Sequence, residues 1–270
     1  MQKIIHTVLN VGLEKPVKIL HLTDIHLTAT DGTDSENHVK LEKERKELFR
    51  REGNFPPKDP EEYFKEALDL AEELGALPVV TGDVIDILTN GNVAEFHRIA
   101  DGHDIMFTPG GHEHQRRCHR TLEEPDAYWI GARQRLKEAF PEFDLDFSSR
   151  VVNGLNIVCA DNSLDYYNAE SFRRFKEERE KGLPMLLFSH DPVSDSFLNK
   201  TESWNENITL TPDDFKTSHE MFDLIQNDPK IVAYVTGHFH LEAEIPLKSG
   251  KTCYVTPGLY SGICRLIEIR

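Results

Sequence analysis

The sequence has no long hydrophobic run, few cysteines and no excess of positive charge. None of its apolar stretches approaches the roughly 18–20 residues that a membrane-spanning helix needs, so no membrane anchor is expected. The first twenty residues lack the charged, apolar and small-residue order of a secretory signal. The four cysteines are Cys118, Cys159, Cys253 and Cys264, and they show no C-x-x-C spacing. A zinc knot or a disulfide framework is therefore not expected, and the sequence predicts reduced thiols in a cytoplasmic protein.

The charge of the chain is strongly acidic. Its 270 residues contain 47 Asp and Glu against 31 Lys and Arg, which gives a formal net charge of -16. A protein that coats nucleic acid needs clustered Lys and Arg to neutralise phosphates, so nucleic acid is an unlikely partner. There is also no P-loop and no Rossmann glycine fingerprint. The 13 histidines exceed what a core normally absorbs, although His21, inside an apolar run, is expected to be a core residue.

Short apolar strands alternate with amphipathic helices, which predicts an α/β fold. We expect a single domain over residues 1–270 in which Asn153-Gly154 forms a hairpin turn. A charged insertion at about 35–54 is expected to be a solvated helix or a mobile loop, and about 115–143 a helical surface segment. The expected strands are 17–22, 77–80, 104–107, 151–152, 155–160, 185–189, 231–236 and an antiparallel series within 242–269. The expected helices are 60–74, 171–181 and 219–226.

Five expected strands end in residues that can bind a divalent cation. These strand ends are Asp24-Ile25-His26, Gly82-Asp83-Val84-Ile85-Asp86, Gly110-Gly111-His112-Glu113, Ser189-His190 and Gly237-His238-Phe239-His240. Carboxylate and imidazole are ligands for Zn, Mn and Fe, and ligands of α/β folds bind at the carboxyl ends of strands. In an extended segment residues i and i+2 point to the same side. Asp24 with His26, and His238 with His240, are therefore each expected to present two ligands toward one place.

In this order the motifs resemble those of the calcineurin-like metallophosphoesterases, whose blocks read D-x-H, G-D-x-x-D, G-N-H-[ED], H and G-H-x-H. HLTDIHL, TGDVID and TGHFH match closely, and the resemblance extends from Val17 to the C-terminus. It implies a four-layer αββα sandwich of two mixed β-sheets flanked by helices, with a dinuclear centre of Mn, Fe or Zn. It further implies hydrolysis of phosphate esters by a metal-bridging hydroxide. TDIHL and GHFH look nearest to the bacterial cyclic-nucleotide phosphodiesterases, which favours a small-molecule phosphodiesterase.

The resemblance also implies a role for each motif residue. His112 would protonate the leaving oxygen, and Asp86 would orient and charge His112. The other interpretation of Asp86, as a helix N-cap, is compatible with that role. The implied metal ligands are Asp24, His26 and His240 for one ion, His190 and His238 for the other, and Asp83 as the bridge between them.

The sequence departs from the family pattern at Gly111, which stands where the family has asparagine. That asparagine supplies an oxygen to the second metal and can contact substrate. The second metal site is therefore expected to be weakened, unless a neighbour such as Glu113 or His114 fills the position. Arg116 and Arg117 are candidates for binding an anionic part of the substrate, and Gly111 is a further candidate substrate contact. The other interpretation of the two arginines is a helix face balanced by acidic residues.

The leading hypothesis is therefore a cytoplasmic, metal-dependent phosphoesterase that acts on a small phosphate diester. A phosphomonoesterase or a nuclease of the same fold is an alternative, although a nuclease would need a basic track beside the site. The remaining alternative is a degenerate member of the fold that binds its second metal weakly and acts as an interaction module. Gly111 favours that alternative, whereas the otherwise complete set of motif residues argues against it. The oligomeric state is left open by the sequence.

Overall fold

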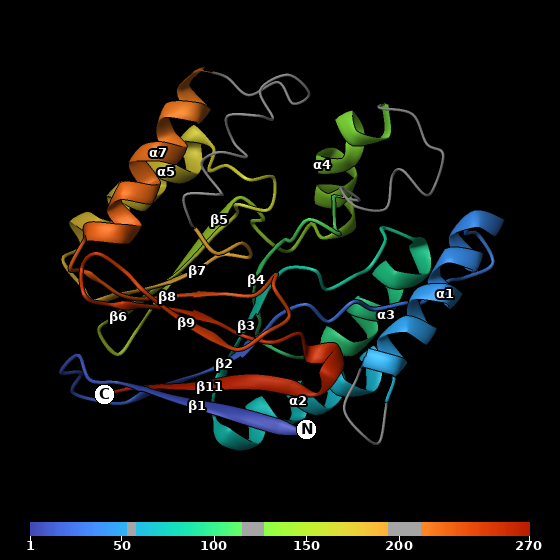
Figure 1. The fold of residues 1–270 in the computed structure, drawn as a ribbon, viewed down its shortest axis with the longest axis horizontal. Helices are drawn as coiled ribbons and strands as arrows, with labels where there is room; N and C mark the ends of the chain where they lie inside the picture. Colours follow the sequence, from blue (N-terminus) through green and yellow to red (C-terminus); the bar gives the residue numbers. More distant parts are fainter. Residues whose placement is uncertain (53–57, 115–126, 194–211) are drawn as a thin grey trace.

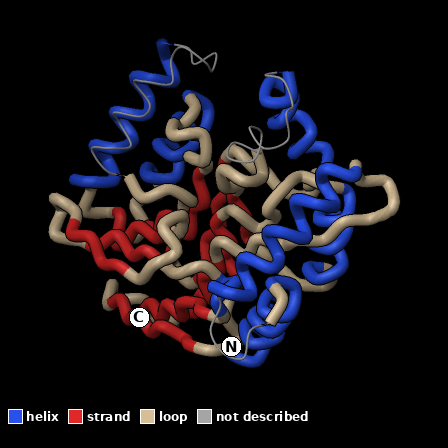
Figure 2. The backbone as a smooth tube through the Cα atoms, turned by 45° about the vertical axis from the view of Figure 1, so that its right-hand side comes forward, coloured by secondary structure: helices blue, strands red, loops and turns tan. Residues whose placement is uncertain are grey.

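The structure is a computed structural model that describes residues 1–52, 58–114, 127–193 and 212–270. Two mixed β-sheets pack against each other, and helices cover the outer face of each sheet (Figures 1 and 2). This arrangement confirms the expected four-layer α/β sandwich. Among the described residues, no helix combines the length and the hydrophobicity that crossing a bilayer requires.

The first sheet has five strands, and its order brings the two ends of the chain together. Strand β11 lies beside β1 in parallel and beside β2 in antiparallel orientation, whereas β2, β3 and β4 run parallel. In spatial order the strands are β1 (Lys3–Leu9), β11 (Ile263–Ile269), β2 (Val17–Leu22), β3 (Leu77–Thr81) and β4 (Met106–Thr108). The parallel β2, β3 and β4 therefore end at one edge, where three of the motif loops begin.

The second sheet has six strands and supplies the other two motif loops. Its central strands β6, β7, β8 and β10 run parallel, and an antiparallel strand flanks each end. In spatial order the strands are β5 (Phe147–Val152), β6 (Leu155–Ala160), β7 (Met185–Phe188), β8 (Ile231–Thr236), β10 (Thr252–Val255) and β9 (Ala243–Pro246).

Helices lie on both outer faces. Helices α2 and α3 contribute to the core of the first sheet, and α5 and α7 to the core of the second (Figure 1). Helix α2 begins with Pro60 in its first turn and ends at Gly75, which is left-handed with φ 59°. The helices are α1 (Glu36–Glu52), α2 (Pro60–Leu74), α3 (Asn90–Ala100), α4 (Ala127–Ala139), α5 (Ala169–Glu180), α7 (Pro212–Asn227) and the short 3-10 helix η1 (Leu259–Ser261).

Alternating side chains along the strands fill three apolar layers. On β2, Ile19 packs between the two sheets, whereas Leu20 packs toward the helices of the first sheet. On β7, Phe188 packs between the sheets and Leu187 toward the helices of the second sheet. Both faces of these strands are buried, which explains why their sequences are continuous apolar runs.

The structure confirms the hairpin at Asn153-Gly154, because β5 and β6 pair in antiparallel orientation around that turn. The prediction of one antiparallel series within 242–269 is wrong. Strands β9 and β10 do pair antiparallel, but β10 also pairs in parallel with β8, and β11 belongs to the other sheet. Strand β1 and helix α3 carry no expectation from the sequence, although Thr89 caps α3 by accepting a hydrogen bond from the backbone N–H of Asn92.

A buried polar network joins the two sheets below the motif loops. The imidazole of His21 lies 2.8 Å from Thr256 Oγ1 and 2.7 Å from Thr81 Oγ1. The guanidinium of Arg265, also buried, donates from Nε to Thr256 Oγ1 at 3.1 Å. Burial and the positive charge of Arg265 lower the pKa of His21 to about 3. His21 is therefore a neutral core residue with both ring nitrogens satisfied, as expected.

Replacing His21 by glutamine is expected to flatten the pH dependence of stability. The folded pKa of about 3 lies below the unfolded value of 6.5, so only the unfolded chain takes up this proton between those values. The free energy of unfolding consequently falls as the pH falls through this window, by at most about 1.4 kcal/mol per pH unit from this group. Urea denaturation of wild type and His21→Gln across the window measures the difference, with the exposed His6→Gln as control. Equal slopes for wild type and His21→Gln would contradict this assignment.

Candidate metal centre

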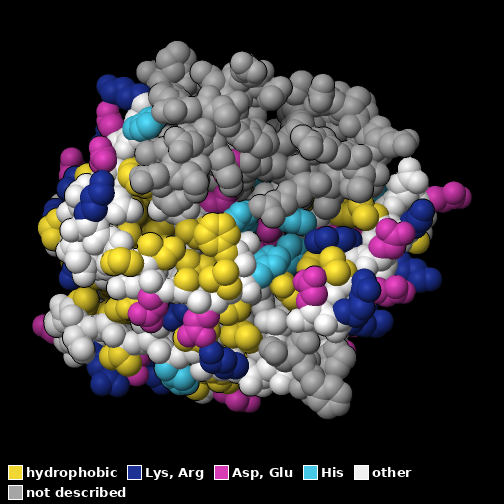
Figure 3. All heavy atoms as spheres, in the orientation of Figure 1, with side chains coloured by type: hydrophobic (Ala, Val, Ile, Leu, Met, Phe, Trp, Pro, Cys, Tyr) yellow, Lys and Arg dark blue, Asp and Glu magenta, His cyan; other side chains and the backbone are white. Residues whose placement is uncertain are grey.

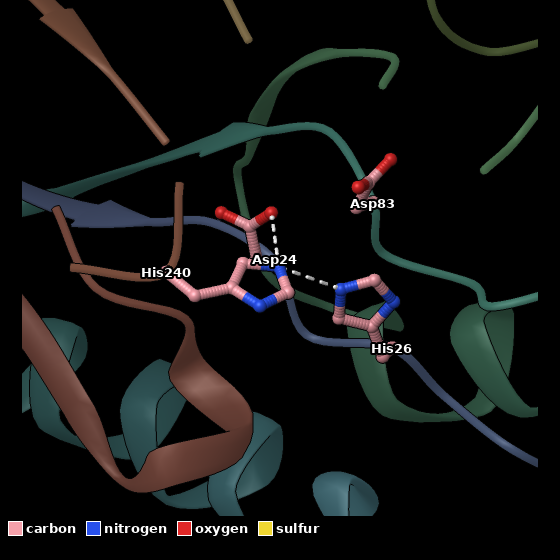
Figure 4. Close-up of side chains that lie close together, drawn as sticks. All are labelled: Asp24, His26, Asp83 and His240. Carbon is pink, nitrogen blue, oxygen red and sulfur yellow. Dashed lines mark hydrogen bonds and ion pairs between the residues drawn. The ribbon is translucent and has the colours of Figure 1, made fainter. Parts of the chain in front are cut away.

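The motif loops bring carboxylates and imidazoles into three adjoining clusters. In the first, one ligand atom from each of four residues lies within 4.8 Å of all the others. Asp24 Oδ1 is 3.1 Å from His240 Nε2, which is in turn 3.2 Å from His26 Nε2 (Figure 4). The fourth member is Asp83, at the end of β3. Side chains from three loops far apart in sequence therefore point toward one place.

The second cluster shares Asp83 with the first. It consists of Asp83, His190 and His238, again with ligand atoms within 4.8 Å of one another. The contact between Asp83 Oδ2 and His190 Nε2 measures 3.2 Å. Because one carboxylate belongs to both clusters, the arrangement can hold two cations side by side with Asp83 between them.

The third cluster adjoins the first and is formed around Asp86. Asp86 Oδ1 lies 3.0 Å from His26 Nδ1 and 3.1 Å from His112 Nδ1. The guanidinium of Arg45, on α1, donates to both Asp86 oxygens at 2.6 and 2.8 Å. Although burial alone would raise the pKa of Asp86, His112, His26 and Arg45 hold it well below its usual range. Asp86 is therefore an ionised carboxylate that connects His112 to the candidate ligand His26.

The donor set fits divalent cations. Within the described part of the chain, the buried atoms Asp24 Oδ1 and His190 Nε2 have no partner in hydrogen-bond geometry, although His240 Nε2 and Asp83 Oδ2 face them at 3.1 and 3.2 Å. Burial lowers the pKa of His26 to about 4, so its imidazole is neutral, the form that binds metal. Burial by itself would raise the pKa of Asp83, but the neighbouring imidazoles, His190 first, hold it well below its usual range. Two anionic carboxylates and the imidazole nitrogens thus surround a space in which a cation would neutralise the negative charge of the carboxylates.

The backbone at these ligands is strained. Asp24, His26, Asp83, His238 and His240 have φ between 49° and 68°, a region that residues with a side chain rarely adopt. Strain of this kind costs on the order of 1–3 kcal/mol per residue and persists where the surrounding structure enforces it. The loops are accordingly not extended, so the geometry assumed for the i and i+2 positions is wrong. Asp24 and His26 nevertheless reach one cluster, as expected, whereas His238 and His240 turn to different clusters.

Glu113 holds the ligand loops together and does not join a metal cluster. Its two carboxylate oxygens accept hydrogen bonds from the backbone N–H groups of Asp83, Val84, Ile85 and Gly110, at 2.5 to 3.2 Å. Burial and the nearby Asp83 raise the pKa of Glu113 to about 7. The expectation that Glu113 could replace the ligand missing at Gly111 is therefore wrong.

His114 is also unavailable as a replacement ligand, because its Nε2 lies 3.1 Å from the guanidinium of Arg133. That guanidinium donates to Asp161 at 2.6 Å and also contacts Asp146. Gly111 itself is buried next to His112. Of the three expected substrate contacts, Gly111 is described, whereas Arg116 and Arg117 lie outside the described residues.

Helix α1, expected to be a solvated helix or a mobile loop, covers the first cluster. Its Phe49 is buried and stacks on His26 with ring centroids 4.7 Å apart, and it also packs against Tyr260. The hydroxyl of Tyr260 lies 3.1 Å from His240 Nδ1. No motif in the sequence indicates these contacts, because Arg45 and Phe49 reach the site only through packing.

Asp191 is a further neighbour of the second cluster that the sequence motifs did not identify. Asp191 follows His190 directly, and its Oδ1 lies 3.1 Å from His238 Nδ1. Its position at the same strand end was a signal that could have identified it.

On the surface, histidines gather near the centre of one face, between a hydrophobic area and Lys and Arg side chains (Figure 3).

Comparison with known proteins agrees with this geometry. A model of the calcineurin-like phosphoesterase family matches residues 17–242, which include every motif residue. A comparison with curated proteins by sequence finds no match.

Similar solved structures include a dimetal phosphatase from Danio rerio, with 12% identity, a TM-score of 0.50, and coverage of 91% of this chain and 88% of that one. A 5'-nucleotidase from Candida albicans aligns with 13% identity and a TM-score of 0.44, over 96% of this chain and 47% of that one. A phosphopantetheinyl hydrolase from Mycobacterium tuberculosis aligns with 12% identity and a TM-score of 0.41, over 93% and 92% of the two chains. At 12% identity, the similarity to the dimetal phosphatase supports the fold assignment and nothing beyond it.

Replacing Gly110 by alanine is expected to disrupt the site. A Cβ at Gly110 would lie 2.3 Å from Asp83 Oδ1 and 2.4 Å from the Asp83 backbone nitrogen, so the loops after β3 and β4 would have to separate. We expect a loss of about 1–3 kcal/mol in the free energy of unfolding and weaker metal binding. Urea denaturation and metal titration measure both. The matched control is Gly32→Ala, where an added Cβ meets nothing within 4 Å. Equal behaviour of the two variants would refute the close approach.

Proposed function

Because the chain belongs to the calcineurin-like phosphoesterase family, we propose that it is a two-metal phosphodiesterase of small phosphate esters. Metal-dependent hydrolysis of phosphate esters is the activity of the family. The finer assignment of ligands and of a diester substrate is our proposal. The observation that carries it is the Asp83 carboxylate, which is common to two clusters of ligand atoms.

In this proposal the first and second clusters would each hold one divalent ion, and the third would hold none. The ligands of the first ion would be Asp24, His26 and His240, those of the second His190 and His238, and Asp83 would serve both. When bound, the two ions supply positive charge for the phosphate oxygens and acidify a water molecule. The ions would also offset the acidity of the chain where the substrate binds, because a local charge outweighs a distant one.

His112 is proposed as the proton donor to the leaving oxygen. Its Nδ1 lies 3.1 Å from the ionised Asp86 and 3.0 Å from the Asp86 backbone carbonyl, so Nδ1 can donate to Asp86. A neighbouring carboxylate stabilises the positively charged imidazole, which favours its use as an acid. Arg45 fixes the orientation of Asp86 through two hydrogen bonds.

A diester substrate is supported by the apolar surface beside the histidines. Phe239, between His238 and His240, is 48% exposed, and Leu241 is 49% exposed. Figure 3 shows hydrophobic side chains next to the histidines on this face. A diester carries a second organic group that needs such a surface, whereas a monoester carries one. The net charge of -16 disfavours long polyanionic substrates.

A cytoplasmic location is the corresponding proposal for the environment. Cys159, Cys253 and Cys264 are free and buried, and burial raises the pKa of each thiol to about 12. These cysteines are unreactive packing residues, consistent with a reducing compartment.

Removal of metal is expected to abolish hydrolysis of bis(p-nitrophenyl) phosphate. Without cations the carboxylates of the clusters are uncompensated, and nothing supplies positive charge for the phosphate oxygens or acidifies water. Added Mn²⁺ is expected to restore the activity. Colorimetric turnover before and after chelation, with circular dichroism to monitor folding, makes the measurement. The monoester p-nitrophenyl phosphate is expected to react more slowly, and a faster monoester reaction would refute the diester assignment. A metal-loaded protein without turnover on either ester would instead favour the interaction module.

Replacing His112 by asparagine is expected to lower kcat by about 10²–10⁴ for diesters with a poor alkoxide leaving group. The loss is expected to be much smaller for a p-nitrophenolate leaving group, which needs no proton. Rates on both substrate types, with the partly exposed His97→Asn as control, measure this difference. Equal losses on both types would exclude His112 as the proton donor.

A further inference from the structure

The carboxylate of Asp191 faces the second cluster directly. Asp191 is the residue after His190, beyond the end of β7, and it is 5% exposed. Its Oδ1 lies 3.1 Å from His238 Nδ1 and 3.7 Å from His190 Nε2. One carboxylate oxygen is therefore in contact range of both imidazoles that are proposed to hold the second ion.

These separations match those between ligands that share one ion. Ligand atoms about 2.0–2.2 Å from a metal, at tetrahedral angles, lie roughly 3.3–3.6 Å apart, and somewhat closer at right angles. The contacts of His238 with Asp191 at 3.1 Å and of His190 with Asp83 at 3.2 Å are close to that spacing. The contact between Asp191 and His190 is slightly longer.

The ring of His190 is oriented with one edge toward the two carboxylates. Its Nδ1 donates to the carbonyl oxygen of Thr81 at 2.8 Å, which fixes the ring. Its Nε2 consequently faces Asp83 Oδ2 at 3.2 Å and Asp191 Oδ1 at 3.7 Å. The nitrogen that a metal would bind therefore lies beside the carboxylates of both Asp83 and Asp191.

The backbone of Asp191 is fixed by buried side chains, so its carboxylate is held toward the cluster. The amide of Asn162 accepts from the Asp191 N–H at 3.0 Å and donates to the Asp191 carbonyl at 2.7 Å. The hydroxyl of Tyr234 donates to the same carbonyl at 2.8 Å. A ligand supported by such a rigid second layer needs little reorganisation when an ion binds.

We propose that Asp191 is a direct oxygen ligand of the second metal ion. This inference rests on the two-metal site proposed above. Gly111 offers no side-chain donor, and neither Glu113 nor His114 is free to supply one. Asp191 completes a set of two carboxylates and two imidazoles for the second ion. That ion is consequently bound by an anionic oxygen, and the expected weakening of the second site does not occur.

Metal stoichiometry tests whether Asp191 holds the second ion. Wild type, dialysed against Mn²⁺, is expected to bind two ions by elemental analysis and calorimetry. Asp191→Ala is expected to bind the second ion at least about tenfold more weakly. The control is Asp161→Ala, which removes a largely buried carboxylate that pairs with Arg133. This control is expected to bind two ions as wild type does.

Cobalt spectroscopy tests whether the contact is direct. In Asp191→Cys loaded with Co²⁺, a thiolate ligand would produce a sulfur-to-cobalt charge-transfer band in the near ultraviolet that wild type and Asp161→Cys lack. A residue that merely orients His238 through a hydrogen bond would give no such band.

The outcomes separate the two proposals. Fewer than two ions on wild type would overturn the two-metal function itself. Two ions on both wild type and Asp191→Ala, with no band in Asp191→Cys, would overturn the role of Asp191 and leave the two-metal function standing. A weaker second ion together with the band would establish the ligand.

Discussion

The site depends on one buried carboxylate, that of Asp83. Its Oδ1 accepts the backbone N–H of His112 at 2.8 Å, and its Oδ2 faces His190. Its backbone carbonyl accepts from the N–H of His26 at 2.8 Å, and its own N–H donates to Glu113. One residue thus ties together the loops after β2, β3, β4 and β7. A negative charge at this depth needs hydrogen-bond donors and positive charge around it, so the loops converge on a place where a cation could be held.

The same constraint explains the strained backbone. Five candidate ligand residues adopt left-handed conformations that would not persist in isolated loops. The packing around them enforces these conformations. A Cβ at Gly237, for example, would approach Asp24 Oδ2 to 2.4 Å, so only glycine allows these two loops to meet. The fold therefore positions the loops of the proposed metal centre in advance, which would reduce the reorganisation that metal binding requires.

Helix α1 shows how a segment without any motif becomes part of the site. Arg45 holds the Asp86 carboxylate, and Phe49 shields the imidazole of His26 from solvent. Exclusion of water strengthens the electrostatic interaction between Asp86 and its histidines. A charged helix that the sequence marks only as an insertion consequently sets the environment of both a proposed ligand and the proposed proton donor.

The sequence by itself determined the fold class and picked out the residues of the candidate site. Buried parallel strands are apolar runs with polar ends, and that pattern is local, so Asp24, Asp83, His190 and His240 could be found without coordinates. Tertiary structure alone decided the pairing of β10 and β11 with different sheets, the left-handed ligand loops, and the contacts of Arg45 and Asp191. These features arise from long-range packing and from charges that meet only in the folded chain, and no local pattern encodes the distance between them.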